Sequence, residues 1–168
     1  MDDEELAALT EAVGSRRAFQ SALDLLSRRD HSKKELLQKL SVKYTKAQAE
    51  AAIEQAQAAG LLDEARFAEN YARELYARKG FGLRRIQMEL ARKGIPREIA
   101  ENALETLDKD DENRIIVLLR EKYRDALTGD EKAKRRAVNA LLRRGYSYSD
   151  IRSAVSACTA EDEEFYDA

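Results

Sequence analysis

Four residue types are almost absent from this sequence, which has one cysteine, one proline, one histidine and no tryptophan. A single cysteine excludes a disulfide within the chain. The single histidine has no partners at ligand spacing, so a metal site is not indicated. We therefore predict that Cys158 fills the apolar core and that His31 stands at the start of a helix. No metal and no cofactor are expected.

Long hydrophobic runs are also missing. No apolar stretch approaches the roughly 18 residues that a membrane-spanning helix needs. The chain begins MDDEEL, which is acidic, whereas a secretory signal starts basic and then becomes apolar. These two features lead us to expect a cytoplasmic protein without a membrane partner.

Motifs that would indicate an enzyme are not found. No glycine-rich loop of the GxxxxGKS kind occurs, and Gly80-Phe81-Gly82 is better explained as a turn between helices. Cys158 has no nearby histidine to activate it. Aspartate and glutamate are plentiful but spread along helices, so paired carboxylates arise by chance. We expect no catalytic residues.

Charge is plentiful, and its distribution is uneven. Charged residues make up 37% of the chain, yet the formal net charge is only −2. Residues 1–11 and residues 159–168 each hold five acidic residues and no basic one, so the body between them carries an excess of eight positive charges. Two interpretations stay open: solvated helix surfaces, or a basic body that meets a polyanion or an acidic protein groove while the tails compete for it.

Two segments of the chain are versions of one another. RRIQMELARKGI (Arg84 to Ile95) and RRAVNALLRRGY (Arg135 to Tyr146) align at an offset of 51 residues. A looser third copy, KKELLQKL, begins at Lys33. Self-similarity of this kind indicates a short array of near-equal units, each too small to bury its apolar face alone.

Apolar residues recur at helical spacing, and no segment alternates with the period of a strand. Glycines fall where the periodicity breaks, and the pairs Ser32–Glu35, Thr45–Gln48, Thr128–Glu131 and Ser147–Asp150 fit the capping box. The predicted helices are 16–28, 32–41, 46–59, 63–79, 83–93, 96–108, 111–125, 130–144 and 148–158, with an extra helix in 1–13.

The predicted fold is therefore all-α, with three tandem three-helix repeats in an elongated, curved array. The repeats are 16–60, 61–108 and 109–158, between an acidic N-terminal extension (1–15) and an acidic C-terminal tail (159–168). The middle repeat is expected to be the best packed, with Phe67 and Tyr71 as internal aromatic anchors.

Basic clusters are the feature that most clearly suggests a function. Positive charge suits the carboxyl end of a helix, which is a structural explanation for Arg92 and Lys93. It does not explain arginine pairs at helix starts, where something outside the helix must favour them. The candidate partner-binding residues are Arg78, Lys79, Arg84, Arg85, Arg92, Lys93, Arg135, Arg136, Arg143 and Arg144.

Four segments together resemble the regulatory protein RecX family. They are LLSRRDHSKKELLQKL (Leu25 to Leu40), GLLDEARFAENY (Gly60 to Tyr71), KGFGLRRIQMELARKGIP (Lys79 to Pro96) and RRGYSYSDI (Arg143 to Ile151). The resemblance covers about 20–155, and its order and spacing make it specific. The positions that match the family are Asp63, Arg66, Phe67, Lys79, Gly80, Gly82, Arg84, Arg85, Ile86, Leu90, Gly94 and Ile95.

This resemblance implies an all-helical protein of three tandem three-helix units that binds the RecA recombinase, chiefly its filament on single-stranded DNA. Such proteins act in recombinational DNA repair and the SOS response. They lower the ATPase, strand-exchange and coprotease activities of RecA, by blocking filament growth or by binding within the groove of the filament and loosening it. They need no cofactor, and some bind DNA weakly. Lys79, Arg84 and Arg85 are then the expected contacts of a monomer.

Two other functions stay open. Three-helix units can mimic helix-turn-helix geometry, so the chain could be a plain nucleic-acid-binding module. It could also be a helical scaffold for some other protein.

Overall fold

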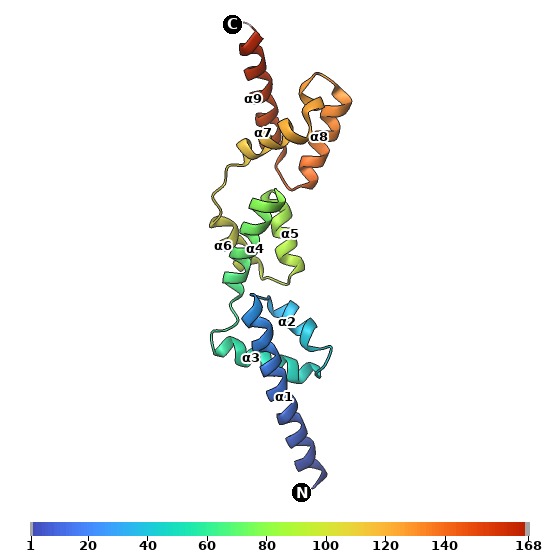
Figure 1. The fold of residues 1–168 in the computed structure, drawn as a ribbon, viewed down its shortest axis with the longest axis vertical. Coiled ribbons are helices and arrows are strands. Elements are labelled where there is room, and N and C mark those ends of the chain that lie inside the picture. Colours follow the sequence, from blue (N-terminus) through green and yellow to red (C-terminus); the bar gives the residue numbers. More distant parts are fainter. Residues whose placement is uncertain (1, 167–168) are drawn as a thin grey trace. The chain divides into compact units, whose positions relative to one another are not determined.

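The chain folds into helices joined by short turns. The computed structural model describes residues 2–166, with side chains through residue 160. Within that range it contains nine α-helices, one 3-10 helix and no strand (Figure 1). The elements are α1 (Asp3–Arg28), α2 (Lys33–Leu40), α3 (Lys46–Ala58), α4 (Glu64–Lys79), α5 (Leu83–Arg92), α6 (Arg97–Glu105), α7 (Asp111–Lys122), η1 (Arg124–Leu127), α8 (Glu131–Arg143) and α9 (Tyr148–Tyr166). The predicted all-α class is confirmed.

Three of the four predicted caps are present at helix starts. Thr45 and Gln48 form a full capping box at α3. The side chain of Ser32 accepts from the amide of Glu35, and Ser147 does the same for Asp150. These bonds satisfy backbone amides that the first helical turn leaves without partners.

The Thr128–Glu131 prediction is wrong. Helix α8 starts at Glu131, and the cap is Asp130, whose carboxylate accepts from the amide of Lys132 at 2.9 Å. Aspartate is at least as good an N-cap as threonine and lies nearer to the helix start, so it takes the role.

The predicted helix boundary near Gly14 is also wrong. Helix α1 runs without a break through Gly14, which is only partly buried. A methyl group at Gly14 would collide with the side chain of Gln48 in α3, so the glycine makes room for a neighbour instead of ending the helix. Helix α1 itself begins with a capping box between Asp2 and Glu5.

The chain divides into two compact units. Unit 1 contains Met1–Tyr71 and Leu90–Ala103, and unit 2 contains Ala72–Glu89 and Leu104–Ala168. The division passes through α4, α5 and α6. The three repeat boundaries and the curved, elongated shape stay predictions.

The core of unit 1 forms where α1, α2 and α3 meet. Ala18 and Ala22 of α1 are fully buried against Leu36 of α2 and Ala52 and Ile53 of α3. Small residues on α1 and α3 allow the two helices to approach closely.

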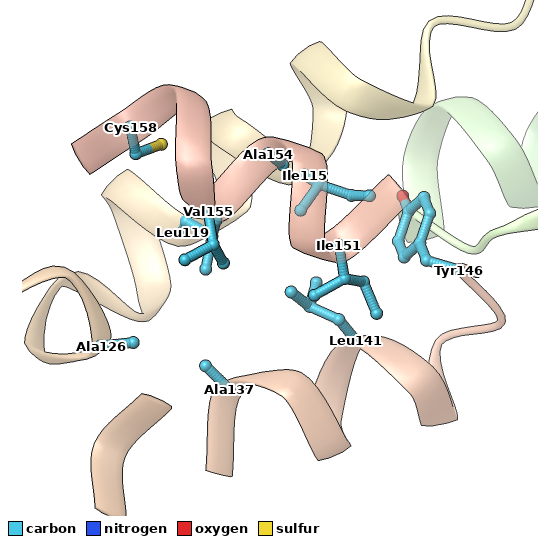
Figure 2. Packing of buried hydrophobic residues seen from close by; sticks show 10 residues of the cluster. All are labelled: Ile115, Leu119, Ala126, Ala137, Leu141, Tyr146, Ile151, Ala154, Val155 and Cys158. Atoms are coloured by element: carbon cyan, nitrogen blue, oxygen red, sulfur yellow. The ribbon is translucent and has the colours of Figure 1, made fainter. Parts of the chain in front are cut away.

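The core of unit 2 is built from α7, η1, α8 and α9. Figure 2 shows Ile115 and Leu119 of α7 pointing toward Leu141 of α8 and Ile151 of α9. Cys158 is also buried here, as predicted. Replacing one of these large aliphatic residues by alanine would cost about 2–5 kcal/mol.

Of the two predicted aromatic anchors, one is buried. Phe67 is 5% exposed, whereas Tyr71 is only partly buried. Their rings stack with centroids 5.6 Å apart.

Candidate partner-binding surface

The ten predicted contact residues lie in both units. Eight of them are at or beside helix ends, whereas Arg135 and Arg136, expected at a helix start, are not. The ten residues occupy the end of α4, both ends of α5, the middle of α8 and its end. The structure divides them into two kinds: cations that hold neighbouring helices together, and cations that face solvent.

Lys93 belongs to the first kind and joins α5 to α2 in unit 1. Its ammonium nitrogen lies 2.5 Å from Oε1 of Glu35 and 5.4 Å from the centre of the Tyr71 ring. In the same contact Lys34 donates to the carbonyl of Arg92 at 3.0 Å. Burial alone would raise the pKa of Glu35, but hydrogen bonds from Lys93 and Arg29 hold that pKa below its ordinary value.

Arg66 makes a second link in unit 1, between α4 and the turn after α1. Its Nε and Nη2 atoms donate to the carboxylate of Asp30, the shortest bond being 2.8 Å. The hydrogen bonds from Arg66 hold the pKa of Asp30 below its ordinary value. A bidentate contact of this kind fixes the orientation of both side chains.

Arg144 plays a comparable role in unit 2. It donates from Nη1 to the carbonyl of Lys79 at 3.0 Å, which caps the end of α4. Tyr146, 1% exposed, donates its hydroxyl to the carbonyl of Gly80 at 2.9 Å. The amide of Gly82 donates to the carbonyl of Arg144 at 2.7 Å. The Gly80–Gly82 segment is thus a turn, as predicted, and it is bound to the turn between α8 and α9.

Glycines allow both of these helix contacts to be close. A methyl group on Gly82 would lie 2.5 Å from the backbone carbon of Gly145, and one on Gly145 would collide with the backbone of Arg85. The equivalent glycine one repeat earlier, Gly94, lies against Lys34, where a methyl group would come within 2.9 Å of Cβ. The glycine that ends one repeat copy therefore meets the start of the preceding copy in both units.

Arg114 is a structural residue that the sequence analysis missed. Its guanidinium carbon lies 3.9 Å from the centre of the Tyr76 ring, and it donates to the Tyr76 carbonyl. The Tyr76 hydroxyl in turn donates to Asp111 and accepts from the amide of Asp110, both at 3.0 Å. Arg114 lies 48 residues after Arg66, and each follows an aspartate by three positions, a second repeated signal that could have revealed it.

Arg85 is also held within the fold. It pairs with Glu89 at 2.8 Å, one helical turn away, and its guanidinium carbon lies 5.2 Å from the centre of the Phe81 ring. Arg84, beside it, points to solvent.

The remaining cations are exposed. Among the described side chains, no ion pair or hydrogen bond is formed by those of Arg78, Lys79, Arg84, Arg135, Arg136 and Arg143. The side chain of Arg92 is exposed too, but it has a partner. The six residues leave positive charge on both the α4–α5 turn and α8.

A cleft of about 350 Å³ lies in unit 2, and we call it the α4–α7 cleft. It is lined by residues 77–80 at the end of α4, by six residues of α7, and by Arg144 and Tyr146. Five of the lining residues are basic and one, Glu121, is acidic. Helix α7 contributes Arg114, Val117, Leu118 and Lys122 at helical spacing, so they form one face.

Three protein-family models match the chain in order. They are described as the first, second and third three-helix domains of RecX, and they match residues 18–55, 63–104 and 110–155. Two relatives, both called "Regulatory protein RecX", come from Stenotrophomonas maltophilia (strain R551-3) and Vibrio campbellii. The first is 35% identical over 80% of this chain and 83% of its own length, and the second is 36% identical over 86% and 92%.

The chain belongs to the RecX family. A crystal structure of RecX from Lactobacillus salivarius has a TM-score of 0.75 at 25% identity, covering 88% of this chain and 97% of that one. A second crystal structure, of a regulatory protein RecX, has a TM-score of 0.79 at 21% identity. The tandem three-helix arrangement predicted from the repeats is confirmed, and each of the three matched models describes a RecX domain.

The single histidine of the chain is buried. His31 is 3% exposed and its Nδ1 atom is hydrogen-bonded to the carbonyl of Arg29 at 2.9 Å, so it packs where a helix starts. Burial lowers its pKa. The described residues include no cluster of three or more potential metal ligands. None of the helices in the described part of the chain is both long and apolar enough to span a membrane.

Proposed function

We propose that this protein regulates a RecA recombinase by binding the RecA filament on single-stranded DNA. Binding lowers the ATPase, strand-exchange and coprotease activities of RecA. The observation that carries the proposal is the match of three consecutive RecX domains across residues 18–155, together with relatives named as regulatory proteins. On this proposal the protein acts as a cytoplasmic monomer without a catalytic site.

The exposed cations are the proposed contacts. A RecA–DNA filament offers phosphates and protein carboxylates, and an unpaired surface cation loses little when it meets either of them. Arg84 fits this role because it lies in the first turn of α5, where the helix dipole disfavours positive charge, and Arg135 and Arg136 fit it because they are exposed on α8. Arg78, Lys79 and Arg143 complete the proposed surface.

We leave four residues of the predicted set out of the proposed surface, and one of them, Arg92, already has a partner. Lys93, Arg85 and Arg144 bind other groups of their own unit, so changing them would disturb the fold first. The proposed contact surface is therefore smaller than the sequence analysis predicted, and it excludes the cations that join helices.

ATP hydrolysis by RecA on single-stranded DNA tests the proposed function. Adding the protein at or below one molecule per RecA monomer should slow hydrolysis in proportion to its concentration. Hydrolysis that continues at the same rate at equimolar protein would end the proposal. The assay needs RecA and DNA but no labelled form of the protein.

Direct DNA binding is the second candidate, and the exposed arginines favour it. Binding through phosphates weakens steeply with salt, because each neutralised phosphate releases a counterion. If the protein binds naked single-stranded DNA strongly at physiological salt and slows RecA only by competing for DNA, this function replaces the first. Negligible affinity for naked DNA together with slowed hydrolysis supports contact with the filament.

A further inference from the structure

The α4–α7 cleft combines positive charge with an aliphatic surface. Val117 is 51% exposed although it is apolar, and the partly buried Leu118 lies beside it. Arg78, Lys79 and Lys122 line the same cleft, and among the described residues their side chains form no ion pair. A volume of about 350 Å³ is enough for one or two side chains of a ligand.

Five basic residues line the cleft against one carboxylate, that of Glu121, and the negative end of α4 is partly bound by two of those basic residues. The last carbonyls of a helix carry partial negative charge. In α4 two of them, those of Tyr76 and Lys79, accept hydrogen bonds from Arg114 and Arg144. A carboxylate that enters the cleft therefore meets the cations and not the exposed end of a helix.

Aromatic stacking, which single-stranded nucleic acids use, is not offered by the cleft. Binding of unpaired bases depends on an accessible aromatic face. Tyr146 is the only aromatic residue that lines this cleft, and it is 1% exposed. The nearby Tyr76 ring, 5% exposed, is covered by Arg114. The accessible apolar surface is aliphatic, which fits a branched side chain and not a base.

We propose that the α4–α7 cleft is a docking site for an acidic peptide segment of a partner protein, with one aliphatic side chain flanked by carboxylates. The aliphatic side chain packs on Val117 and Leu118, and the carboxylates pair with Arg78, Lys79 and Lys122. The proposal adds the chemistry of the occupant to one part of the contact surface. The test uses no RecA, so a negative result leaves the ATPase prediction unchanged. Likewise, a failure to slow ATP hydrolysis by RecA leaves the peptide-binding prediction unchanged.

A binding assay with synthetic peptides tests the proposal directly. The probe is a fluorescein-labelled peptide with three glutamates on each side of one leucine, and the readout is fluorescence anisotropy with the full-length protein. Arg78→Glu should weaken binding by about tenfold, equivalent to about 1.4 kcal/mol, and Val117→Ser should weaken it by about threefold. Lys43→Glu is the matched control, because it makes the same charge change on an exposed residue outside both the cleft and the proposed contact surface and should leave affinity within twofold.

Two comparisons require no protein variant, so they stand even if a substitution impairs folding. The same peptide with its leucine replaced by serine should bind at least threefold more weakly to the unaltered protein. Equal binding would show that charge alone is recognised and would overturn the proposal. Oligodeoxythymidylate that binds more tightly than the peptide, and displaces it from the cleft, would overturn it in favour of nucleic acid.

Other occupants would show themselves in the same experiment. If changing the four acids at 161–164 to their amides tightens peptide binding tenfold, the chain's own acidic end occupies the cleft and the proposal is wrong. Concentration-dependent self-association that Arg78→Glu abolishes would instead identify a second copy as the occupant. The absence of saturable binding to the unaltered protein would also overturn the proposal.

Discussion

Neighbouring cations with the same sequence context have different roles in this protein. Arg84 and Arg85 are adjacent, yet Arg84 faces solvent and Arg85 is held by Glu89 and Phe81. The sequence indicates where the cations gather, because charge and repeat position are properties of the sequence alone. It could not separate contact residues from structural ones, because that depends on which side of a helix meets a neighbour.

Tyr76 tests the structural role of the residues around Arg114. Tyr76→Phe removes a hydroxyl that bonds to both Asp110 and Asp111, so the free energy of unfolding should fall by about 1 kcal/mol. Tyr148→Phe is the matched control, because Tyr148 is 61% exposed and should change stability by less than about 0.5 kcal/mol. Urea unfolding followed by circular dichroism measures both, and equal effects would contradict the assigned role.

The Asp30–Arg66 contact makes a prediction about pH. The pKa of Asp30 is lower in the folded protein than in the unfolded chain, so its stabilisation is fully present above the unfolded value of about 3.9. It is lost as the pH falls through the lower, folded pKa. Arg66→Ala should therefore destabilise the protein equally at pH 5 and pH 7, and by less below pH 4.

Carbon NMR provides the direct measurement of this contact. The carboxyl carbon of Asp30 should titrate at a lower pH in the unaltered protein than in Arg66→Ala. An unchanged midpoint would show that the hydrogen bonds from Arg66 do not set the pKa of Asp30.

Contacts between helix ends explain the repeated motif at the scale of elements. Gly94 and Gly145, equivalent in the two copies, each lie against the start of a helix from the preceding copy. The sequence predicted the equivalence from the fixed offset, and it predicted left-handed backbone where helices end. It could not predict the close approach of each glycine to a neighbouring helix. In a sequence, a glycine needed for its positive φ cannot be told from one needed for its small size.

Substitution by alanine separates these two requirements. Gly145 and Gly129 both have positive φ, at 95° and 88°, but a methyl group on Gly129 would meet nothing within 4 Å. Gly129→Ala should cost about 1–2 kcal/mol from backbone strain alone. Gly145→Ala should cost at least about 1 kcal/mol more, because the methyl group collides with the backbone of Arg85.

Urea unfolding of both glycine variants measures the difference. Equal destabilisation would mean that glycine is needed at position 145 only for its positive φ, and not for the close contact with Arg85.

Helix boundaries were the weakest part of the sequence prediction. Gly14 was expected to end a helix and lies inside α1, where Gln48 occupies the space a side chain would fill. Helix α9 was expected to end at 158, but its backbone continues to Tyr166. Both errors have one cause. Local residue preferences predict a helix end at these positions, but contacts with other helices and the continuity of the helix determine where it ends.

At the scale of the whole molecule, the fold class and the family were predictable and the contact surface was not. Internal repeats, helical spacing and an ordered set of motifs are properties of the sequence alone, and they indicated three-helix units of the RecX family. A contact surface depends instead on which cations remain unpaired after folding. The α4–α7 cleft forms where the end of α4 meets α7, and these two segments belong to different predicted repeats.

The central claim is that exposed, unpaired cations contact the RecA filament while the cations between helices maintain the fold. Inhibition of RecA ATP hydrolysis by Arg84→Glu tests it most directly, with Lys43→Glu as a control that changes the same charge on an exposed residue outside the proposed surface. The claim predicts that Arg84→Glu weakens inhibition by about tenfold or more, with helicity and unfolding midpoint unchanged, while Lys43→Glu inhibits as the unaltered protein does. Full inhibition by correctly folded Arg84→Glu would contradict it.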